Sequence, residues 1–140
     1  MSKVLLRKWL GERGYELVSS SRDEFSCNRR TVSYNKRLSK DHQIYTILHE
    51  CGHLILLSSE SYNSTYKIQS EAIEDGRVRG SLSWRINLLK EEFHAWDEGK
   101  KLAKQLGIFV DEKKYDKYSS RCLRLYCMWV VEPHKFKRVG

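Results

Sequence analysis

The stretch from Ile44 to Leu57 places the strongest constraint on how this chain folds. It is almost entirely apolar, and its length favours a helix over a strand. Ser39 and the polar residues after it are suited to capping the start of such a helix. A helix of this composition is buried nearly all round, yet it carries His49, Glu50 and His53. These polar side chains are costly to bury without partners, so the fold must supply them.

His49, Glu50 and His53 form an H-E-x-x-H motif. Residues four apart on a helix share one face, so both imidazoles can point at one ion. Glu50 lies about 100° further round the helix, close enough to act on a water molecule without binding the metal. We therefore expect His49 and His53 to bind Zn²⁺ and Glu50 to act as general base in a hydrolysis. The alternative is a pair of core histidines satisfied by the backbone or by other side chains.

Glu92 is the candidate for a third metal ligand. Periodicity predicts a helix from about Ile86 to Leu106, ended by Gly107, whose apolar face comprises Ala95, Trp96, Gly99, Leu102, Ala103 and Leu106. Extended back one turn, this face reaches Glu92. The opposite face collects polar residues that suit water: Glu91, His94, Glu98, Lys101 and Gln105. We expect one Zn²⁺ per chain, held by His49, His53 and Glu92, or else an ion pair of Glu92 with Arg85 or Arg121.

The rest of the chain predicts an α+β domain that spans residues 1–140, with a short antiparallel sheet and about four helices, and the H-E-x-x-H motif on the central one. A short helix is expected at 3–10, three strands at 15–19, 24–28 and 31–35, and a last helix at about 111–131. The core face of that last helix is predicted to hold Tyr115, Tyr118, Cys122, Leu125, Tyr126 and Trp129. Residues 58–70 are polar and rich in Ser, which is typical of an exposed loop.

Residues 31–56 resemble the core of the ImmA/IrrE-type zinc peptidases. In that family a strand ending in Asn is followed by a short linker and an aromatic-Thr-x-x-His-Glu-x-Gly-His helix, and Asn35, Tyr45 and Thr46 match. The second motif of the family places its ligand Glu three residues before an Ala, as Glu92 and Ala95 are placed here. The resemblance implies a zincin-like fold and a gluzincin metal site, with the ligands and base already chosen from the residues.

The same resemblance implies that the peptide substrate binds to an edge strand by β-addition. In this chain that strand is formed by Thr31, Val32, Ser33 and Tyr34. The chain departs from the family at Glu98-Gly99, where a Phe-Ala pair is usual, and it lacks the Leu-Leu-Met-Pro end. A long polar stretch also separates the two motifs. These departures indicate a divergent branch, of the kind carried by phages or other mobile elements.

Charge is distributed unevenly along the chain, whose net charge is +8. Residues 1–40 carry ten basic and four acidic groups and residues 99–140 carry eleven and four, whereas residues 41–98 carry five and ten. Basic ends of this kind either are solvated or attract nucleic acid or an acidic protein. The candidate nucleic-acid contacts are Lys113, Lys114, Lys117, Arg121 and Arg124.

The sequence contains no apolar run of the 18 or more residues that a membrane-spanning helix needs, and charge interrupts the apolar residues at its start. We expect a cytoplasmic protein without membrane contact. Cys27, Cys51, Cys122 and Cys127 lack C-x-x-C spacing, which favours reduced thiols in or near the core.

Two functions follow from these observations. One is a zinc metallopeptidase that hydrolyses a peptide bond in a specific regulatory protein. The alternative is a protein that keeps the zincin fold but only binds nucleic acid, a DNA-bound protein or a regulator through its basic ends. For the peptidase, a residue that stabilises the oxyanion is also required. The candidates that the sequence offers for it are His94, Tyr115, Tyr118 and His134.

Overall fold

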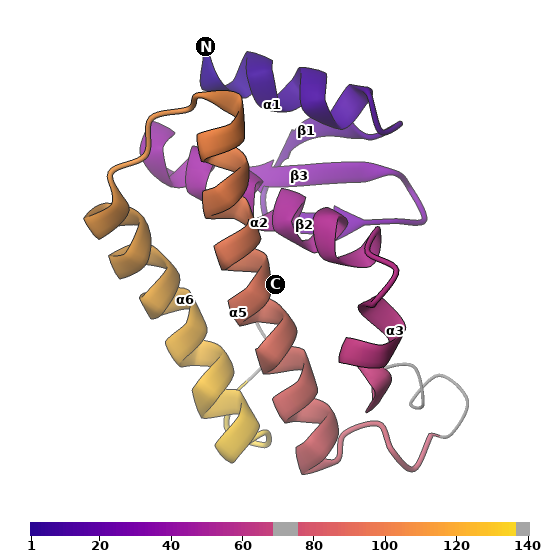
Figure 1. Cartoon of the computed structure of the whole chain (residues 1–140). Helices are drawn as coiled ribbons and strands as arrows, with labels where there is room; N and C mark the ends of the chain where they lie inside the picture. Colours follow the sequence, from indigo (N-terminus) through magenta and orange to yellow (C-terminus); the bar gives the residue numbers. More distant parts are fainter. Residues whose placement is uncertain (69–75, 137–140) are drawn as a thin grey trace.

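The computed structural model describes residues 1–68 and 76–136. Figure 1 shows a small sheet beside a group of helices, which confirms the α+β class. In chain order the described elements are α1 (Ser2–Gly11), β1 (Glu16–Ser20), β2 (Glu24–Ser26), β3 (Thr31–Asn35), α2 (Lys40–Leu57), α3 (Tyr62–Thr65), α5 (Leu82–Leu106) and α6 (Glu112–Val131). None of the helices in these two ranges is long and apolar enough to cross a membrane.

The three strands form a mixed sheet in the order β1-β3-β2. β2 pairs antiparallel with β3, as expected, but β1 pairs parallel with β3, with Leu17 opposite Val32. The expectation of a wholly antiparallel sheet was therefore wrong for this pair. The prediction that Thr31–Tyr34 is an edge strand was also wrong, because both sides of β3 are already paired. Among the described strands, β1 and β2 are the edges.

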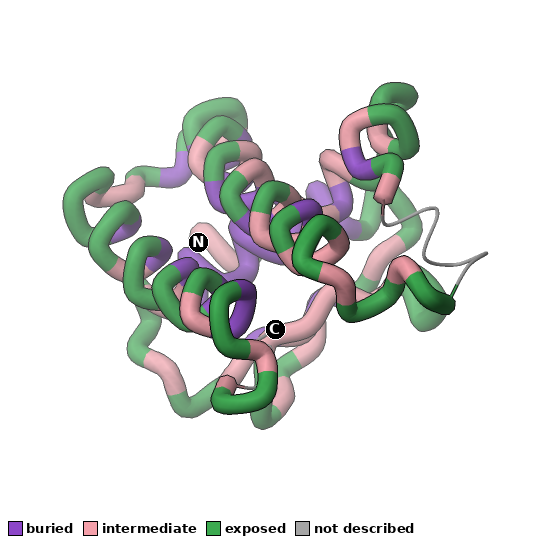
Figure 2. The backbone as a smooth tube through the Cα atoms, turned by 90° about the horizontal axis from the view of Figure 1, so that it is seen from below, coloured by how far each residue is buried: buried purple, intermediate pink, exposed green. Residues whose placement is uncertain are grey.

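α2 is the central helix and carries the H-E-x-x-H motif. Its N-terminus is capped by Ser39, whose hydroxyl accepts a hydrogen bond from the backbone N–H of His42 at 3.2 Å. Residues 45–52 are all buried, which confirms the expectation of a helix enclosed on nearly every side. In Figure 2 the buried stretches gather where the helices face one another at the centre of the molecule.

α2 and α5 approach closely through two glycines. A Cβ at Gly52 would lie 2.0 Å from the backbone oxygen of Ala95, and one at Gly99 would lie 2.6 Å from that of Leu48. No side chain larger than hydrogen fits at either crossing point. This contact brings the early turns of α5 next to the histidines of α2.

α5 ends where Gly107 adopts a left-handed conformation, with φ of 70°, and α6 then runs back beside α5 (Figure 1). α6 starts at the expected place, with Asp111 as its cap. Its core face is only partly as expected, since Leu125 is 42% exposed. Tyr115, Tyr126 and Trp129 are buried as predicted, together with Ser119, Leu123 and Val130.

The segment after α2 is largely exposed, as its composition suggested, but it is not a plain loop. Its described part, up to residue 68, includes the short helix α3, and Tyr66 directly after that helix is only 1% exposed. Residues 69 and 70 of the predicted loop lie outside the described residues. None of the four cysteines forms a disulfide; Cys51 is buried as expected, whereas Cys27 and Cys127 are exposed.

Candidate metal centre

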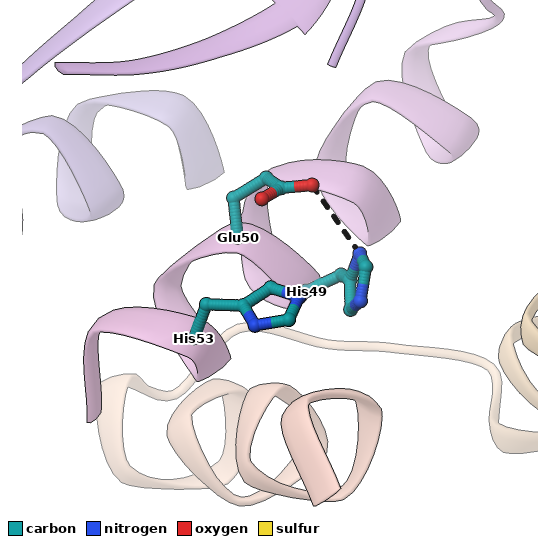
Figure 3. A group of neighbouring side chains, drawn as sticks. All are labelled: His49, Glu50 and His53. Carbon is teal, nitrogen blue, oxygen red and sulfur yellow. Dashed lines mark ion pairs between the residues drawn. The ribbon is translucent and has the colours of Figure 1, made fainter. Parts of the chain in front are cut away.

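His49 and His53 lie one turn apart on α2, and Glu50 lies between them in the sequence (Figure 3). Together these three side chains form a group whose possible ligand atoms lie within 4.8 Å of one another. Glu50 is 5% exposed, and its Oε1 lies 3.4 Å from Nδ1 of His49. The motif therefore places its three polar groups together, as its spacing predicted.

Glu92 reaches the same point from α5. Its Oε2 lies 2.8 Å from Nε2 of His49, and its Oε1 lies 3.2 Å from Nε2 of His53. Two imidazole nitrogens and one carboxylate thus converge from two helices. The alternative pairing of Glu92 with arginine is not present, since the Arg85 Nε donates to the carbonyl of Val130 and the guanidinium of Arg121 lies over the Tyr118 ring.

The chemistry of this donor set fits a zinc ion, which binds imidazole nitrogen and carboxylate oxygen. All three groups are nearly buried, with side-chain exposures of 10% for His49 and 11% each for His53 and Glu92. Three protein ligands leave a position open for water or substrate, which distinguishes a catalytic zinc site from a structural one.

The carboxylates and the histidines of the site stabilise each other's charged forms. Burial opposes the charged form of both histidines, but the carboxylates around them outweigh it, so the pKa of His49 is raised and that of His53 is raised well above its usual value. Burial alone would raise the pKa of Glu92, but its hydrogen bonds with His49 and His53 outweigh burial and lower that pKa. These contacts favour the protonated histidines in the metal-free protein, so a divalent ion would compete with protons for the imidazole nitrogens.

Each histidine ring is also held from the side. The ring of His49 stacks on Trp96, with centroids 4.1 Å apart and planes inclined by 7°. The ring of His53 lies parallel to Phe25 of β2 at 6.5 Å. Trp96 follows Glu92 by one turn of α5, so the same helix supplies a carboxylate and a packing surface to His49.

Glu91 is the site residue that sequence reasoning missed. Helical periodicity placed it with His94 on a face suited to water, and for both residues this was wrong. The Oε2 of Glu91 accepts a hydrogen bond from Nδ1 of His53 at 2.8 Å, and its Oε1 accepts one from the Tyr62 hydroxyl at 2.6 Å. These partners lower the pKa of Glu91 although burial alone would raise it. The only signal for Glu91 in the sequence is its position beside Glu92. Two adjacent carboxylates do not show which segment of the chain covers Glu91.

A cleft of about 350 Å³ opens on the metal centre. It is lined by Glu50, His53, Glu91 and Glu92, and further by Glu24, Phe25, Leu88 and Tyr126. Residues Thr31–Tyr34, predicted to bind substrate, are not part of this lining, whereas two residues of the edge strand β2 are.

The four residues suggested for oxyanion stabilisation do not line this cleft. The Tyr115 hydroxyl donates to the backbone oxygen of Trp96 at 2.6 Å, and Nδ1 of His94 is 2.6 Å from the Tyr66 hydroxyl. The Tyr118 ring stacks against His42. Tyr126 of α6, which the sequence assigned to the core, is the tyrosine of the lining.

A comparison with protein families found one match, to the peptidase family described as the IrrE N-terminal-like domain, over residues 11–107. The match includes the sheet, α2 and α5, and it ends before α6. It supports a metallopeptidase-type activity for the fold and site described above. Comparisons with curated proteins and with solved structures gave no match.

Proposed function

Because the chain belongs to the IrrE N-terminal-like domain family, we propose that it is a zinc-dependent metallopeptidase that cleaves a protein substrate. The observation that carries this proposal is the convergence of both Nε2 atoms on the Glu92 carboxylate, with Glu50 beside them. His49, His53 and Glu92 would hold one Zn²⁺ per chain. When bound, the ion would polarise the scissile carbonyl and make a water molecule acidic enough to lose a proton near neutral pH.

Glu50 is the general base in this proposal. Its carboxylate faces the cleft beside both histidines and takes the proton of the attacking water. The same carboxyl group then delivers the proton to the leaving amine. Tyr126 is our candidate for the group that stabilises the oxyanion, since it lines the same cleft from α6.

The substrate is proposed to lie along β2 rather than β3. The outer side of β2 pairs with no described strand, and its Phe25 packs against His53, so a peptide added there would pass the metal centre. Phe25, Leu88 and Tyr126 offer apolar contacts. Glu24 lies at the same cleft, and among the described residues its carboxylate pairs with the exposed Arg22 at 3.8 Å, which favours a basic substrate residue. Cleavage of a peptide library by wild type and Glu24→Lys tests this, and an unchanged sequence preference would contradict it.

Zinc content provides the first test of the metal site. Wild type is expected to hold about one Zn²⁺ per chain, and Glu92→Ala to lose most of it, because two protein ligands alone bind zinc weakly. Zinc-free wild type, even after zinc is added to the folded protein, would overturn the proposal.

Glu50→Gln then separates binding from catalysis. This variant is expected to keep its zinc but to produce no new peptide termini from a library that wild type cleaves. Cleavage at the wild-type rate would show that Glu50 is not the base.

A second candidate activity, the binding of nucleic acid, is favoured by the surface of α6. Its acidic residues are engaged elsewhere: Asp111 caps the helix, while Asp116 and Glu112 pair with Lys100 and Lys104 of α5. The remaining exposed face presents a row of cations spaced by three or four residues: Lys113, Lys117, Arg121 and Arg124, with Lys114 beside them. We propose that this row, the α6 basic row, contacts the phosphates of DNA to which the substrate protein is bound.

Binding of duplex DNA over a range of salt concentrations tests the α6 basic row. The affinity of wild type is expected to fall steeply with salt, and replacement of the row by Gln to weaken binding and reduce the salt slope. The matched control replaces five exposed cations elsewhere: Arg7, Lys8, Arg29, Lys36 and Arg37. Equal losses in both variants would indicate that net charge alone attracts DNA, and would contradict a specific role for α6.

A further inference from the structure

Tyr62 of α3 and Tyr66, directly after α3, each contact α5 through the hydroxyl group. Tyr62 donates to Glu91 Oε1 at 2.6 Å, and the hydroxyl of Tyr66, one turn later, lies 2.6 Å from Nδ1 of His94. Glu91 and His94 are themselves one turn apart on α5. Only the first of these bonds continues to the metal centre, where Glu91 Oε2 meets Nδ1 of His53 at 2.8 Å.

The three groups Tyr62, Glu91 and His53 form a chain with a defined direction. An ionised carboxylate can only accept hydrogen bonds, so the phenol and Nδ1–H both donate to Glu91. A proton on Nδ1 leaves the lone pair of Nε2 for a metal ion, because a neutral imidazole carries one proton. The Glu91 carboxylate thus fixes both the tautomer and the ring orientation of His53, and Tyr62 fixes the carboxylate.

We propose that Glu91 and Tyr62 are positioning residues of the metal centre. Through Tyr62, the polar segment after α2 takes part in metal binding. The inference rests on the proposed zinc site. Glu91 contacts Nδ1 of His53 and not the Nε2 atoms that Glu92 joins, so it acts through His53, and Tyr62 acts through Glu91. Groups that orient a ligand histidine in this way typically change metal affinity about 10- to 100-fold when they are removed.

The Tyr66–His94 pair provides a matched control. It also joins a tyrosine hydroxyl of the segment after α2 to a side chain of α5 at 2.6 Å, and His94 contacts no residue of the metal centre in the interactions described. Loss of the Tyr66 hydroxyl therefore weakens the contact between α3 and α5 without affecting His53. A purely structural role for Tyr62 would make the two tyrosine variants alike.

The experiment measures the zinc affinity of purified full-length protein by competition with a chromophoric chelator. Glu91→Gln is expected to lower the affinity about 10-fold or more, and Tyr62→Phe by a smaller factor of about threefold or more. Tyr66→Phe is expected to stay within about twofold of wild type, because its bond does not reach a ligand. The absorption spectrum of the cobalt-substituted protein should change in the first two variants and not in the third.

The proposed function holds if wild type binds zinc and Glu92→Ala does not. In that case, equal zinc affinities in Tyr62→Phe and Tyr66→Phe, or wild-type affinity in Glu91→Gln, would overturn the inference. Failure of wild type itself to bind zinc would instead overturn the proposed function. If the variants do not fold, long-range ¹H–¹⁵N spectra of zinc-loaded wild type decide the question. His53 protonated on Nδ1 supports the inference, and His53 protonated on Nε2 contradicts it.

Discussion

α5 contacts α2 and α3 in different ways, and these two contacts have different roles at the metal centre. Against α2 it packs backbone to backbone at Gly52 and Gly99, where no Cβ fits. Against α3 it is joined by the long side chains of Tyr62 and Tyr66. The first contact holds the two helix backbones against each other, whereas the second is made by hydrogen bonds of long side chains.

The difference separates two requirements of a three-ligand site. Ligands from two helices must lie at a fixed distance, and this is set by the contact between α2 and α5, which brings Glu92 within 2.8 Å of His49 and 3.2 Å of His53. Each imidazole must also have its ring turned the right way. For His53 that is the contribution of Glu91, which is held by α3. Distance is thus set by close packing, and orientation by polar bonds.

The largest effect is expected from Gly52→Ala. The new Cβ would lie 2.0 Å from the Ala95 oxygen, an overlap that only separation of the two helices can relieve. Overpacking in a core typically costs 1–3 kcal/mol and sometimes more, and here we expect about 3 kcal/mol or more in the free energy of unfolding, with loss of zinc binding. Urea unfolding of the metal-free protein measures the first effect, and chelator competition the second.

Gly11→Ala is the matched control for this substitution. Gly11 ends α1, and a Cβ there meets no atom within 4 Å. Alanine is the better helix former by about 1 kcal/mol, so the change should be neutral or slightly stabilising. If Gly52→Ala resembled this control, the close contact between α2 and α5 would not be what fixes the ligand distance.

An intermediate effect is expected when the pH of the metal-free protein is changed. The raised pKa values of His49 and His53 contribute stability that is fully present below the unfolded value of about 6.5 and is lost as pH rises through the folded values. The lowered pKa values of Glu91 and Glu92 contribute stability that is present above about 4.5 and is lost as pH falls through their folded values.

Both contributions are therefore present together between about pH 4.5 and 6.5, and the metal-free protein should be most resistant to urea in that window. Bound zinc would take the place of protons on the two histidines. The urea midpoint of the zinc-loaded protein should therefore not decline above that window. Urea midpoints measured from about pH 3 to 9, with chelator and with zinc, test this. A metal-free midpoint that rises steadily with pH would contradict the coupling between the helices.

The half of the site that lies on α2 and on the core face of α5 could be predicted from the sequence. His49, Glu50 and His53 follow from spacing, and Glu92 follows from the apolar face of its helix, because burial and helical period are local properties of a segment. Glu91 could not be found in this way. Periodicity assigns it to the outer face, and the cover over that face comes from a polar segment about 30 residues earlier.

The sheet shows the same limit. Each strand was predicted from its residues, but the sheet was expected to be antiparallel throughout, and the family resemblance implied that residues 31–34 form an edge strand. Instead β3 lies between β1 and β2, and its parallel register with β1 depends on tertiary packing rather than on a turn. The segment predicted as an edge is thus the central strand, and it lies next to β2, the edge that we propose for the substrate.

The smallest effect is expected from loss of a single tyrosine hydroxyl between α3 and α5. Tyr66→Phe should lower the free energy of unfolding by about 0.5–1.5 kcal/mol, and Tyr62→Phe, whose hydroxyl serves an ionised carboxylate, by about 1.5 kcal/mol. Urea unfolding without metal measures both. Because the two rings remain, they can still pack against each other at a centroid distance of 5.0 Å, and α3 should stay in place. A loss as large as that of Gly52→Ala would mean that hydrogen bonds, and not close packing, fix the position of α5, and the division between distance and orientation would fail.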